Sequence, residues 1–315
     1  MSNPYRIIFM GTPAFAAESL NLLYKNGYDP IAVYTQPDKI NGRGKRITFS
    51  PVKELALKKN TPLYQPLNFN DEPTIRELKE LEPDLIIVIA YGKILPQSVL
   101  DIPKYGAINV HASILPEYRG AAPIQRAIID GKEKTGVSIM KLDSGMDTGD
   151  VISVAEIKIE EHITAGELFD KLSLLGAEQM IRVLNDLPDM IANAVPQNHE
   201  KATYAEKITK DMGRIDWSKP AHSLDSLIRG MYPNPGTYTF FRGKRIKIHR
   251  VFFKNIDSVQ YQPGQVVDIK NGNIGIATSD GIIYITKLQP ENHKPMNAGD
   301  FNNGYQVKEN DRFDV

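Results

Sequence analysis

Five continuous apolar runs, separated by segments with helical signals, constrain the fold of this chain more than any other feature. The runs occupy residues 5–10, 30–35, 85–90, 106–111 and 136–142. Strands that are apolar throughout are typical of a parallel sheet with helices on both faces, because a solvent-exposed face would carry alternating polar residues. The pattern predicts a doubly wound, mostly parallel α/β sheet of Rossmann-like type in the first part of the chain.

The pattern of apolar residues along the rest of the chain indicates two domains. A long helical pattern runs from Thr164 to about Leu187, after which the periodicity is lost. From residue 237 onward, short apolar runs alternate with Gly, Asn and Asp turns. Short strands at this spacing predict a small antiparallel β-barrel of the OB type. We therefore expect an α/β domain at residues 1–189, a linker at 190–208 and a β-barrel domain at 209–315.

The composition excludes several classes of protein. With 38 basic and 38 acidic residues the formal charge is zero, which by itself gives no reason to expect a nucleic-acid or membrane partner. There is no cysteine, so disulfides, thiolate metal sites and a thiol nucleophile are excluded. The N-terminus lacks the pattern of a signal peptide, and the longest apolar run, residues 85–91, is too short to cross a bilayer. We expect a soluble, cytoplasmic monomer.

Four loops directly follow apolar strands, and a doubly wound sheet binds its ligands beyond the carboxyl ends of its strands. The loops are residues 11–15, 90–96, 111–120 and 143–150. The first contains a glycine where a nucleotide-binding fold places its phosphate turn, but a GxGxxG or P-loop motif is absent. We expect the four loops to line the site.

Two polar residues, Asn109 and His111, interrupt the end of the apolar run at 106–111. Because side chains alternate along a strand, these two lie on one face, about 7 Å apart. An imidazole can accept a proton near neutral pH, and an amide can donate to a developing oxyanion, so the pair suits a tetrahedral intermediate. The alternative is that both side chains only satisfy backbone groups of the loop.

Three carboxylates follow the next apolar run, in the segment DSGMDTGD at residues 143–150. One of them could orient the imidazole and stabilise its protonated form, as the acid of a catalytic triad does. The chain has neither a serine nucleophile in a GxSxG turn nor a second His or Glu at metal-ligand spacing. The nucleophile is therefore expected to belong to a substrate, and we expect no metal.

The segment GAINVHASILPEYRGAAPI, residues 106–124, followed by MDTGD, resembles the folate-dependent formyltransferases. Their pattern is Asn-x-His-x-Ser-(Leu or Ile)-Leu-Pro with a downstream Asp. The resemblance extends through FMGTPAFA, GRGKR, SPVK, LIIVIAYGKILP, YAEKI and LQPENHKPMNAGDF, and so covers nearly the whole chain. It is greatest to those members that formylate initiator methionyl-tRNA.

The resemblance implies the chemistry of the site. Asn109, His111 and Asp147 correspond to the catalytic residues, and the formyl donor is 10-formyltetrahydrofolate. The α-amine of the methionyl group attacks the formyl carbon directly, without a covalent enzyme intermediate. The residues implied to hold the folate are Ile89, Tyr91, Gly92, Ser113, Ile114, Leu115, Pro116, Leu142 and Asp143. From the sequence alone, Ile89 is equally plausible as a core residue and Tyr91 as a half-buried aromatic.

Two basic segments are candidates for contact with tRNA, although each could also be a solvated surface. In the loop QPDKINGRGKR, the resemblance implies that Arg43, Lys45 and Arg46 lie at the acceptor end, with Arg43 as the discriminating residue. In the expected barrel, Arg242, Lys244, Arg245 and Lys247 form the second segment, and Lys207 matches a family lysine near the acceptor end. The chain has Pro-Asn-Pro-Gly at 233–236, where the family often has Pro-Trp-Pro-Gly.

Two other functions remain open. Another 10-formyltetrahydrofolate-dependent enzyme, a formyltransferase acting on an amino sugar nucleotide or a formyl-folate hydrolase, would use the same Asn, His and Asp. The basic GRGKR loop and the C-terminal domain argue against it. The chain could also be a non-catalytic RNA-binding protein with a degenerate α/β domain. The intact Asn109, His111 and Asp147 argue against that function.

Overall fold

A computed structural model describes residues 3–41, 46–256 and 261–314. The chain forms two compact units. The N-terminal unit comprises residues 1–120, 135–157 and 169–204, and the C-terminal unit comprises residues 121–134, 158–168 and 205–315. Two short segments from the first part of the chain, residues 121–134 and 158–168, therefore belong to the C-terminal unit. The predicted boundaries at 189 and 209 stay a prediction.

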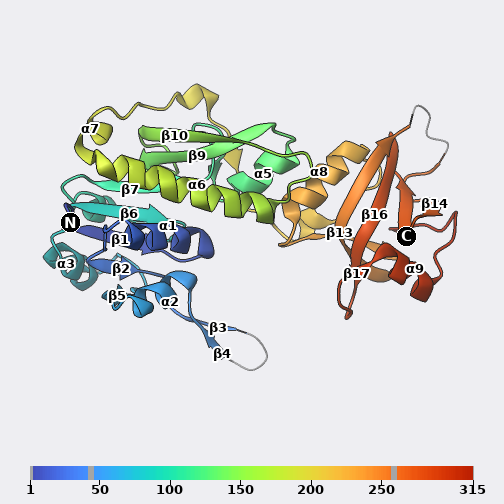
Figure 1. Ribbon diagram of the computed structural model, residues 1–315, viewed down its shortest axis with the longest axis horizontal. Coiled ribbons are helices and arrows are strands. Elements are labelled where there is room, and N and C mark those ends of the chain that lie inside the picture. Colours follow the sequence, from blue (N-terminus) through green and yellow to red (C-terminus); the bar gives the residue numbers. More distant parts are fainter. Residues whose placement is uncertain (1–2, 42–45, 257–260, 315) are drawn as a thin grey trace. The chain divides into compact units, whose positions relative to one another are not determined.

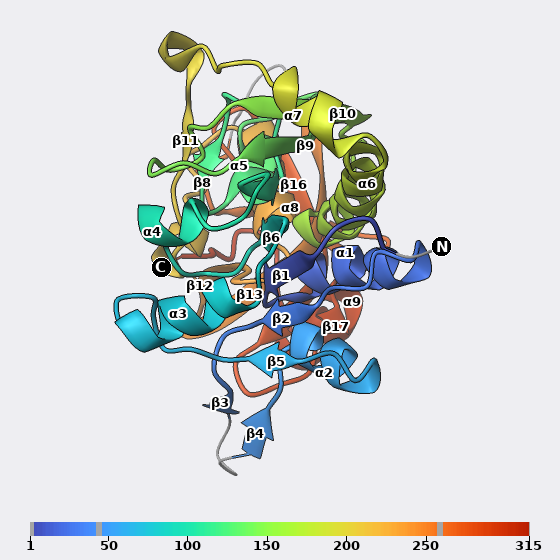
Figure 2. The ribbon, with the colours of Figure 1, turned by 90° about the vertical axis from the view of Figure 1, so that its left-hand side faces the viewer.

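The N-terminal unit is built on a seven-stranded sheet in the order β10-β9-β7-β6-β1-β2-β5. Strands β6, β1, β2 and β5 follow one another in Figure 2. Their bounds, with β7, are β1 Ile7–Gly11, β2 Ala32–Tyr34, β5 Leu63–Tyr64, β6 Leu85–Ile89 and β7 Ala107–His111. These five strands are parallel, as the apolar runs predicted for β1, β2, β6 and β7. The strand order reverses between β1 and β6, so the loops after these strands flank the point where doubly wound sheets bind ligands.

Strand β9 (Lys134–Lys141) differs from the parallel arrangement that the apolar runs suggested. It runs antiparallel to β7, with His111 opposite Ser138 and Ile108 opposite Lys141. β10 (Val151–Lys158) lies beside it at the edge of the sheet. The expectation that residues 143–150 leave the sheet at its carboxyl edge was therefore wrong, because a continuous apolar run shows burial on both faces but not strand direction.

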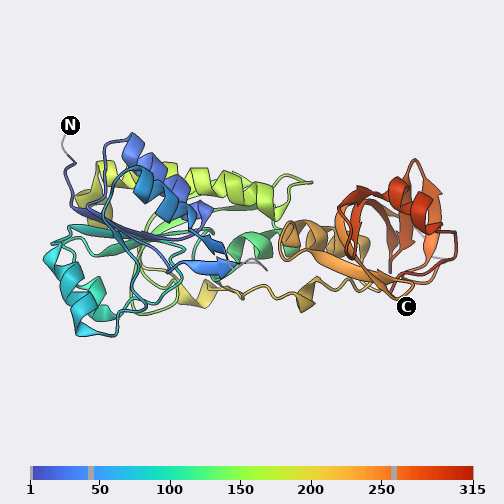
Figure 3. The same cartoon turned by 90° about the horizontal axis from the view of Figure 1, so that it is seen from below.

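Helices cover both faces of this sheet, as Figures 1 and 3 show. α1 (Ala14–Lys25) and α6 (Ala165–Asn185) share one face, where Phe15 packs edge-on against Phe169. α3 (Glu72–Glu80) and α4 (Gln97–Leu100) contribute to the apolar cluster on the other face. The remaining elements of the unit are α2 Pro51–Lys58, α7 Leu187–Ala192, the hairpin strands β3 Lys39–Asn41 and β4 Arg46–Thr48, β8 Arg119–Gly120 and the short helix η1 His199–Lys201.

The C-terminal unit is built on an antiparallel sheet in the order β12-β13-β16-β15-β14, with β17 paired to β16. The strands are β12 Thr237–Phe241, β13 Lys244–Asn255, β14 Val266–Lys270, β15 Asn273–Ala277, β16 Gly281–Pro290 and β17 Met296–Asn297. Its other elements are α5 Pro123–Ile129, β11 Tyr204–Ala205, the short helix η2 Asp211–Gly213, α8 Ala221–Met231 and α9 Ala298–Tyr305. α8 and α9 share an apolar core with the inner face of the sheet.

The end of the chain closes this sheet into a barrel. Arg312 bridges to Gln265 beside β14, and Phe313 bridges to Phe241 of β12. The amide of Asp314 also donates to the Phe240 carbonyl of β12. The two outer strands of the sheet are thus both paired, and closure removes the free edges that favour association with other chains. The predicted small antiparallel barrel is confirmed.

We expect Phe313→Ala to destabilise the C-terminal unit strongly. The Phe313 ring is 1% exposed and stacks on Phe241 with 4.7 Å between centroids. Its loss should lower the free energy of unfolding by about 3–5 kcal/mol, measured in a denaturant titration. Tyr261→Ala, at a partly exposed side chain of the same unit, is the control and should change it by less than about 0.5 kcal/mol. Equal losses would show that the chain end does not close the barrel.

Candidate active site

The two polar side chains at the end of β7 lie on one face of the sheet, as their spacing predicts. Ala107, two residues before Asn109, belongs to the apolar cluster under α3 and α4. Val110, on the opposite face, lies against Gly176 of α6. Asn109 is partly exposed and His111 is buried, with 5% of its surface accessible. The imidazole is therefore held in a protein environment, while the amide beside it remains accessible.

Both nitrogens of the His111 ring face oxygen atoms. Nε2 lies 2.9 Å from the Tyr118 carbonyl oxygen, and Nδ1 lies 3.5 Å from Oδ2 of Asp147. A neutral imidazole carries one N–H and can donate to only one of these acceptors, whereas the doubly protonated ring donates to both. The arrangement can therefore hold a ring that alternates between the two forms, as general acid and base catalysis requires.

The loop that carries Asp147 begins far from the end of β7 and turns back towards it. Because β9 is antiparallel to β7, the loop starts beside Ala107, whose carbonyl accepts from the Leu142 amide at 2.8 Å. The Asp147 carboxylate then reaches the His111 ring and also accepts from the Gly120 amide at 2.8 Å. The predicted convergence of His111 with Asp147 is present, although the loop arrives by a different route.

Three non-glycine residues around the site adopt left-handed backbone conformations, which are uncommon for residues with a side chain. They are Ala90, Tyr118 and Asp147, with φ of 45°, 58° and 53°. Such conformations cost on the order of 1–3 kcal/mol and persist where surrounding contacts hold them. At Tyr118 the contact is a bond from its amide to Thr203 Oγ1, at 2.8 Å. Backbone strain is thus present in the loops that carry the His111 ring's partners Tyr118 and Asp147.

The buried side chain of Arg119, for which the sequence predicted no role, lies next to the loop that carries Asp147. Arg119 is 2% exposed, and its guanidinium donates to Oε1 of Gln197 and contacts Nδ1 of His199. The Gln197 amide in turn donates to the carbonyl oxygens of Asp147 and Gly149. Arg119 lies within the motif at 106–124, but Gln197 lies in the predicted linker, where no sequence pattern marks it.

The last residue of β6 and the loop after it account for three of the predicted folate residues. Ile89 is 0% exposed, so its side chain belongs to the core. The Tyr91 side chain is also buried, and burial raises the pKa of its phenol above the ordinary range, so it stays neutral near pH 7. The Tyr91 carbonyl accepts from Gln36 Nε2 at 2.9 Å and from Thr12 Oγ1 at 3.2 Å. These bonds hold Gly92, which is exposed, beside the loop after β1.

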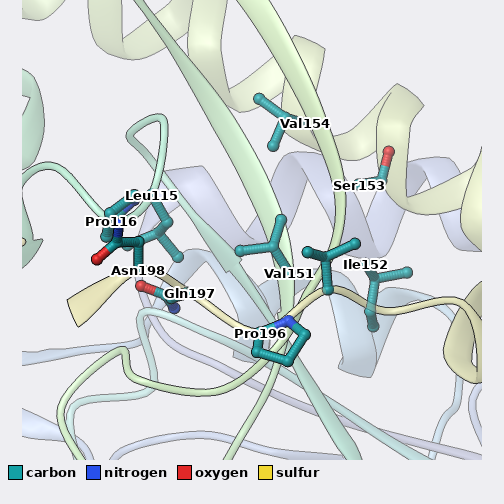
Figure 4. A pocket seen from close by; sticks show the side chains of 10 residues that line it. Leu115, Pro116, Val151, Ile152, Ser153, Val154, Pro196, Gln197 and Asn198 are labelled. Carbon is teal, nitrogen blue, oxygen red and sulfur yellow. The ribbon is translucent and has the colours of Figure 1, made fainter. Parts of the chain in front are cut away.

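The predicted folate residues Ser113–Pro116 form the first turn after β7. The Ser113 hydroxyl donates to the Glu117 carbonyl, so its polar atom serves the loop itself. Leu115 and Pro116 line an open pocket of about 370 Å³ (Figure 4). The other lining residues come from Val151–Val154 of β10 and from Val195–Asn198. Ile114 is partly exposed. The other predicted folate residues are not among those lining this pocket.

The last two predicted folate residues begin the loop that carries Asp147. Leu142 is partly exposed and packs against the apolar cluster under α3 and α4. Asp143 is exposed, and its carboxylate accepts from the Gly145 amide and from Thr148 Oγ1. These two bonds shape the turn within the loop.

The predicted tRNA contacts divide between the two units. Arg43 and Lys45 lie outside the described residues, and Arg46 is the first residue of β4. The strands β3 and β4 form a hairpin, which Asp38 precedes. A hydrogen bond from Lys53 lowers the pKa of the Asp38 carboxyl, so the base of the hairpin carries an ion pair. In the C-terminal unit, Lys207 is exposed.

The barrel cations lie on two different faces. Arg242 donates to the Tyr305 carbonyl and pairs with Asp311, and Lys244 lies over the ring of Tyr305. The side chains of Arg245 and Lys247 lie on the opposite face of β13 from that of Lys244, as their spacing predicts.

The face that carries Arg245 and Lys247 also has aromatic residues. Tyr238 is directly opposite Lys247 in the register of β12 and β13, and Phe240 is opposite Arg245. The Arg245 guanidinium lies 3.8 Å from the centroid of the Tyr238 ring. Arg245 and Lys247, with the two rings, form the outer cationic face of the barrel.

The described ranges hold no cluster of three or more His, Asp or Glu side chains that could bind a metal ion. Within the same ranges, no helix is both long and apolar enough to cross a bilayer.

Residues 5–184 match the formyl transferase family, and residues 207–306 match its C-terminal domain, so the protein is a formyltransferase. A methionyl-tRNA formyltransferase of Caldanaerobacter subterraneus subsp. tengcongensis is 46% identical over 309 residues, covering 96% of this chain and 98% of the relative. That of Acetivibrio thermocellus is 43% identical over 304 residues, again covering 96% and 98%. The chain belongs to the methionyl-tRNA formyltransferase family.

Solved structures share the fold at lower sequence identity. An N-formyltransferase from Helicobacter canadensis, in complex with folinic acid and dTDP-3-aminofucose, superposes with a TM-score of 0.65. It is 20% identical, and the match covers 89% of this chain and 98% of that structure. At this identity the likeness concerns the fold, and it agrees with the mixed sheet and separate antiparallel domain described above.

We expect Gly149→Ala to disturb the Asp147 loop. A Cβ atom at Gly149 would lie 2.0 Å from the Lys141 carbonyl oxygen, so the backbone must move. The free energy of unfolding should fall by about 1–3 kcal/mol, and the rate of formyl transfer should fall with it. Gly304→Ala is the control, because nothing lies within 4 Å of the added methyl group. An unchanged unfolding energy and rate in Gly149→Ala would contradict the tight packing of this loop.

Proposed function

We propose that this enzyme transfers the formyl group of 10-formyltetrahydrofolate to the α-amine of initiator methionyl-tRNA, for translation initiation in the cytoplasm. The observation that carries the proposal is the His111 ring held between Tyr118 and Asp147, with the Asn109 amide on the same face. Membership of the methionyl-tRNA formyltransferase family supports the choice of acceptor.

The proposed reaction uses only groups of the substrates and of this site. The amine nitrogen bonds to the formyl carbon, and the carbonyl oxygen becomes an oxyanion in a tetrahedral intermediate. Asn109 donates a hydrogen bond to that oxygen, and His111 donates one through Nε2 when that atom exchanges the Tyr118 carbonyl for the oxyanion. The bond from carbon to N10 of the folate then breaks, the amine nitrogen loses a proton and N10 gains one. Asp147 orients the His111 ring and stabilises its protonated form while this proton is relayed.

Direct attack by the substrate agrees with the residues of the chain. There is no cysteine, so no thiol can form a covalent intermediate. An α-amine has a pKa of about 8 in model compounds, so a useful fraction is unprotonated near neutral pH. The enzyme then needs to position the amine and the formyl group and to stabilise the charge that develops.

We propose that the folate lies between the loop after β6 and the loop that carries Asp147. The Tyr91 carbonyl is held by Gln36, and the Asp143 carboxylate accepts two bonds within its own loop. The proposed residues are Ile89, Tyr91 and Gly92 at and after the end of β6, Ser113–Pro116 after β7, and Leu142 and Asp143 after β9. Because the side chains of Ile89 and Tyr91 are buried, their contact with the folate would be through backbone groups. In the Helicobacter canadensis N-formyltransferase, the bound folinic acid supports a folate-type donor.

The tRNA is proposed to contact cations of both units. Arg43, Lys45, Arg46 and Lys207 are assigned to the acceptor end by resemblance. In the barrel, Arg242 is paired with Asp311 and held by a backbone carbonyl, and Lys244 lies beside it. Within the described residues, Arg245 and Lys247 on the outer cationic face form no ion pair with an acid, so they are the stronger candidates for contact with phosphates.

The experiment that tests the function is a formylation assay with 10-formyltetrahydrofolate. Initiator methionyl-tRNA should be formylated much faster than elongator methionyl-tRNA, and an amino sugar nucleotide should not be formylated. Formylation of the sugar in preference to the tRNA would assign the enzyme to the other class of acceptor. Failure to formylate any of the three would overturn the proposed function.

We expect His111→Ala to slow formyl transfer by at least about 100-fold, because the ring supplies both proton relay and charge stabilisation. The measurement is the single-turnover rate with saturating folate and charged tRNA, and a thermal unfolding scan shows whether the variant folds. His162→Ala, at an exposed histidine of the C-terminal unit, is the control. A wild-type rate in the folded His111 variant would exclude the assigned role.

We expect Arg245→Ala to weaken binding of the charged tRNA without changing the KM for the folate. Loss of one phosphate contact should reduce the slope of log affinity against log salt by about one. The readout is tRNA binding between low and moderate salt. Arg76→Ala removes an exposed cation of α3 that pairs with Glu72 and serves as the control. An unchanged salt slope in Arg245→Ala would remove this residue from the tRNA interface.

A further inference from the structure

We propose that Arg119 and Gln197 are positioning residues for formyl transfer: they hold the backbone of the Asp147 loop so that its carboxylate meets His111. Neither residue contacts the His111 ring, and neither is assigned a role by the motif that carries the catalytic groups. The inference rests on the proposed function of His111 and Asp147 and deepens it by naming what fixes their geometry.

Arg119 is the largest fully buried side chain within the described residues. Its Nε and Nη2 atoms donate to the same Gln197 oxygen, at 3.1 and 2.7 Å, and Nη2 also lies 3.1 Å from Nδ1 of His199. These contacts of the guanidinium are with an amide oxygen and an imidazole nitrogen rather than with a carboxylate. A buried cation without such partners costs free energy of folding, as any unpaired buried charge does. The guanidinium and the carboxamide therefore hold each other in one orientation.

The contacts of Gln197 determine which way its carboxamide points. A guanidinium has no acceptor, so the Gln197 oxygen must face Arg119 and the nitrogen must face the other side. On that side lie the Asp147 and Gly149 carbonyl oxygens, at 2.9 and 2.7 Å. Both N–H groups are thus used on one loop. The carboxamide connects a buried charge to the two peptide groups that flank the turn after Asp147.

Asp147 is then held at both ends. Its carbonyl is bound by Gln197, and its carboxylate is bound by the amide of Gly120, the residue next to Arg119. Asp147 has the left-handed φ of 53°, which its neighbours must maintain. A loop that relaxed by about 1 Å would move the carboxylate away from His111 Nδ1, and displacements of that size can cost about 100-fold in rate.

The test variant is Gln197→Glu, measured at pH 8 where a glutamate is ionised. The new carboxylate keeps an acceptor for Arg119 and has the same shape, so the buried cation retains its partner. It has no N–H, however, and its second oxygen faces the Asp147 and Gly149 carbonyls. The substitution therefore removes the contact with the loop while leaving the contact with Arg119 in place.

A matched control exists in the same unit. Gln179 is 9% exposed, accepts from Arg182 Nη1 at 3.5 Å and donates to the Ser153 hydroxyl. It is also a largely buried glutamine between an arginine and a second polar group, but it does not contact the Asp147 loop. Gln179→Glu should therefore carry a comparable cost in stability without the effect on catalysis.

We expect Gln197→Glu to lower the single-turnover rate of formyl transfer by about tenfold or more, with the KM values for folate and charged tRNA changed by less than about twofold. Amide hydrogen exchange at Gly120, which requires no activity, should become faster in this variant and stay unchanged in Gln179→Glu. Gln197→Asn, which keeps an amide but shortens its reach, is a second variant in case the glutamate does not fold.

The inference fails if the folded Gln197 variants keep the wild-type rate, if only a KM changes, or if Gln179→Glu loses as much activity. Unchanged exchange at Gly120 would also overturn it. These outcomes are distinguishable from failure of the proposed function, because that failure would appear as absence of formylation by the wild-type enzyme, while the exchange measurement would still report whether Gln197 holds the loop.

Discussion

A buried guanidinium with few partners is the constraint around which the candidate site is organised. Arg119 is almost fully enclosed, and a cation removed from water must be met by acceptors at fixed positions. Its bonds with Gln197 and His199 bring together segments that are far apart in the sequence. Through Gln197 the same contact extends to the peptide groups beside Asp147. The geometry of the proposed catalytic pair, His111 and Asp147, is thus proposed to depend on residues that contact neither the ring nor the carboxylate.

The sheet supplies two kinds of support to this site. The parallel strands place the loops after β1 and β6 next to each other, and bonds to the Tyr91 carbonyl connect them. The antiparallel strand β9 supplies the loop that folds back onto the end of β7. The left-handed conformation at Ala90 lies after β6, that at Tyr118 in the loop after β7 and that at Asp147 in the loop after β9. Rigid strands thus position backbone strain where the chemistry is proposed to occur.

The cations of the C-terminal unit have different surroundings: Arg242 is paired with an acid, whereas Arg245 lies on the outer cationic face. Arg242 is an arginine of the hairpin turn, and it is paired with Asp311 near the chain end that closes the barrel. Arg245 directly follows Lys244, yet its guanidinium lies over the ring of Tyr238 on the outer cationic face. The sequence shows one run of basic residues. The fold assigns some of them to holding the barrel together and leaves others on a surface suited to phosphates.

The apolar strands, the small C-terminal barrel, the shared face of Asn109 and His111, and the family could all be predicted from the sequence. They rest on side-chain alternation and motif spacing, which are properties of neighbouring residues. The direction of β9, the pairing of Arg242 and the link from Arg119 through Gln197 to Asp147 are visible only in the folded chain. Gln197 lies 78 residues from Arg119 and 50 from Asp147, so the path of the chain alone makes them neighbours. A buried polar group takes whichever partners the fold brings to it, and no local pattern encodes that choice.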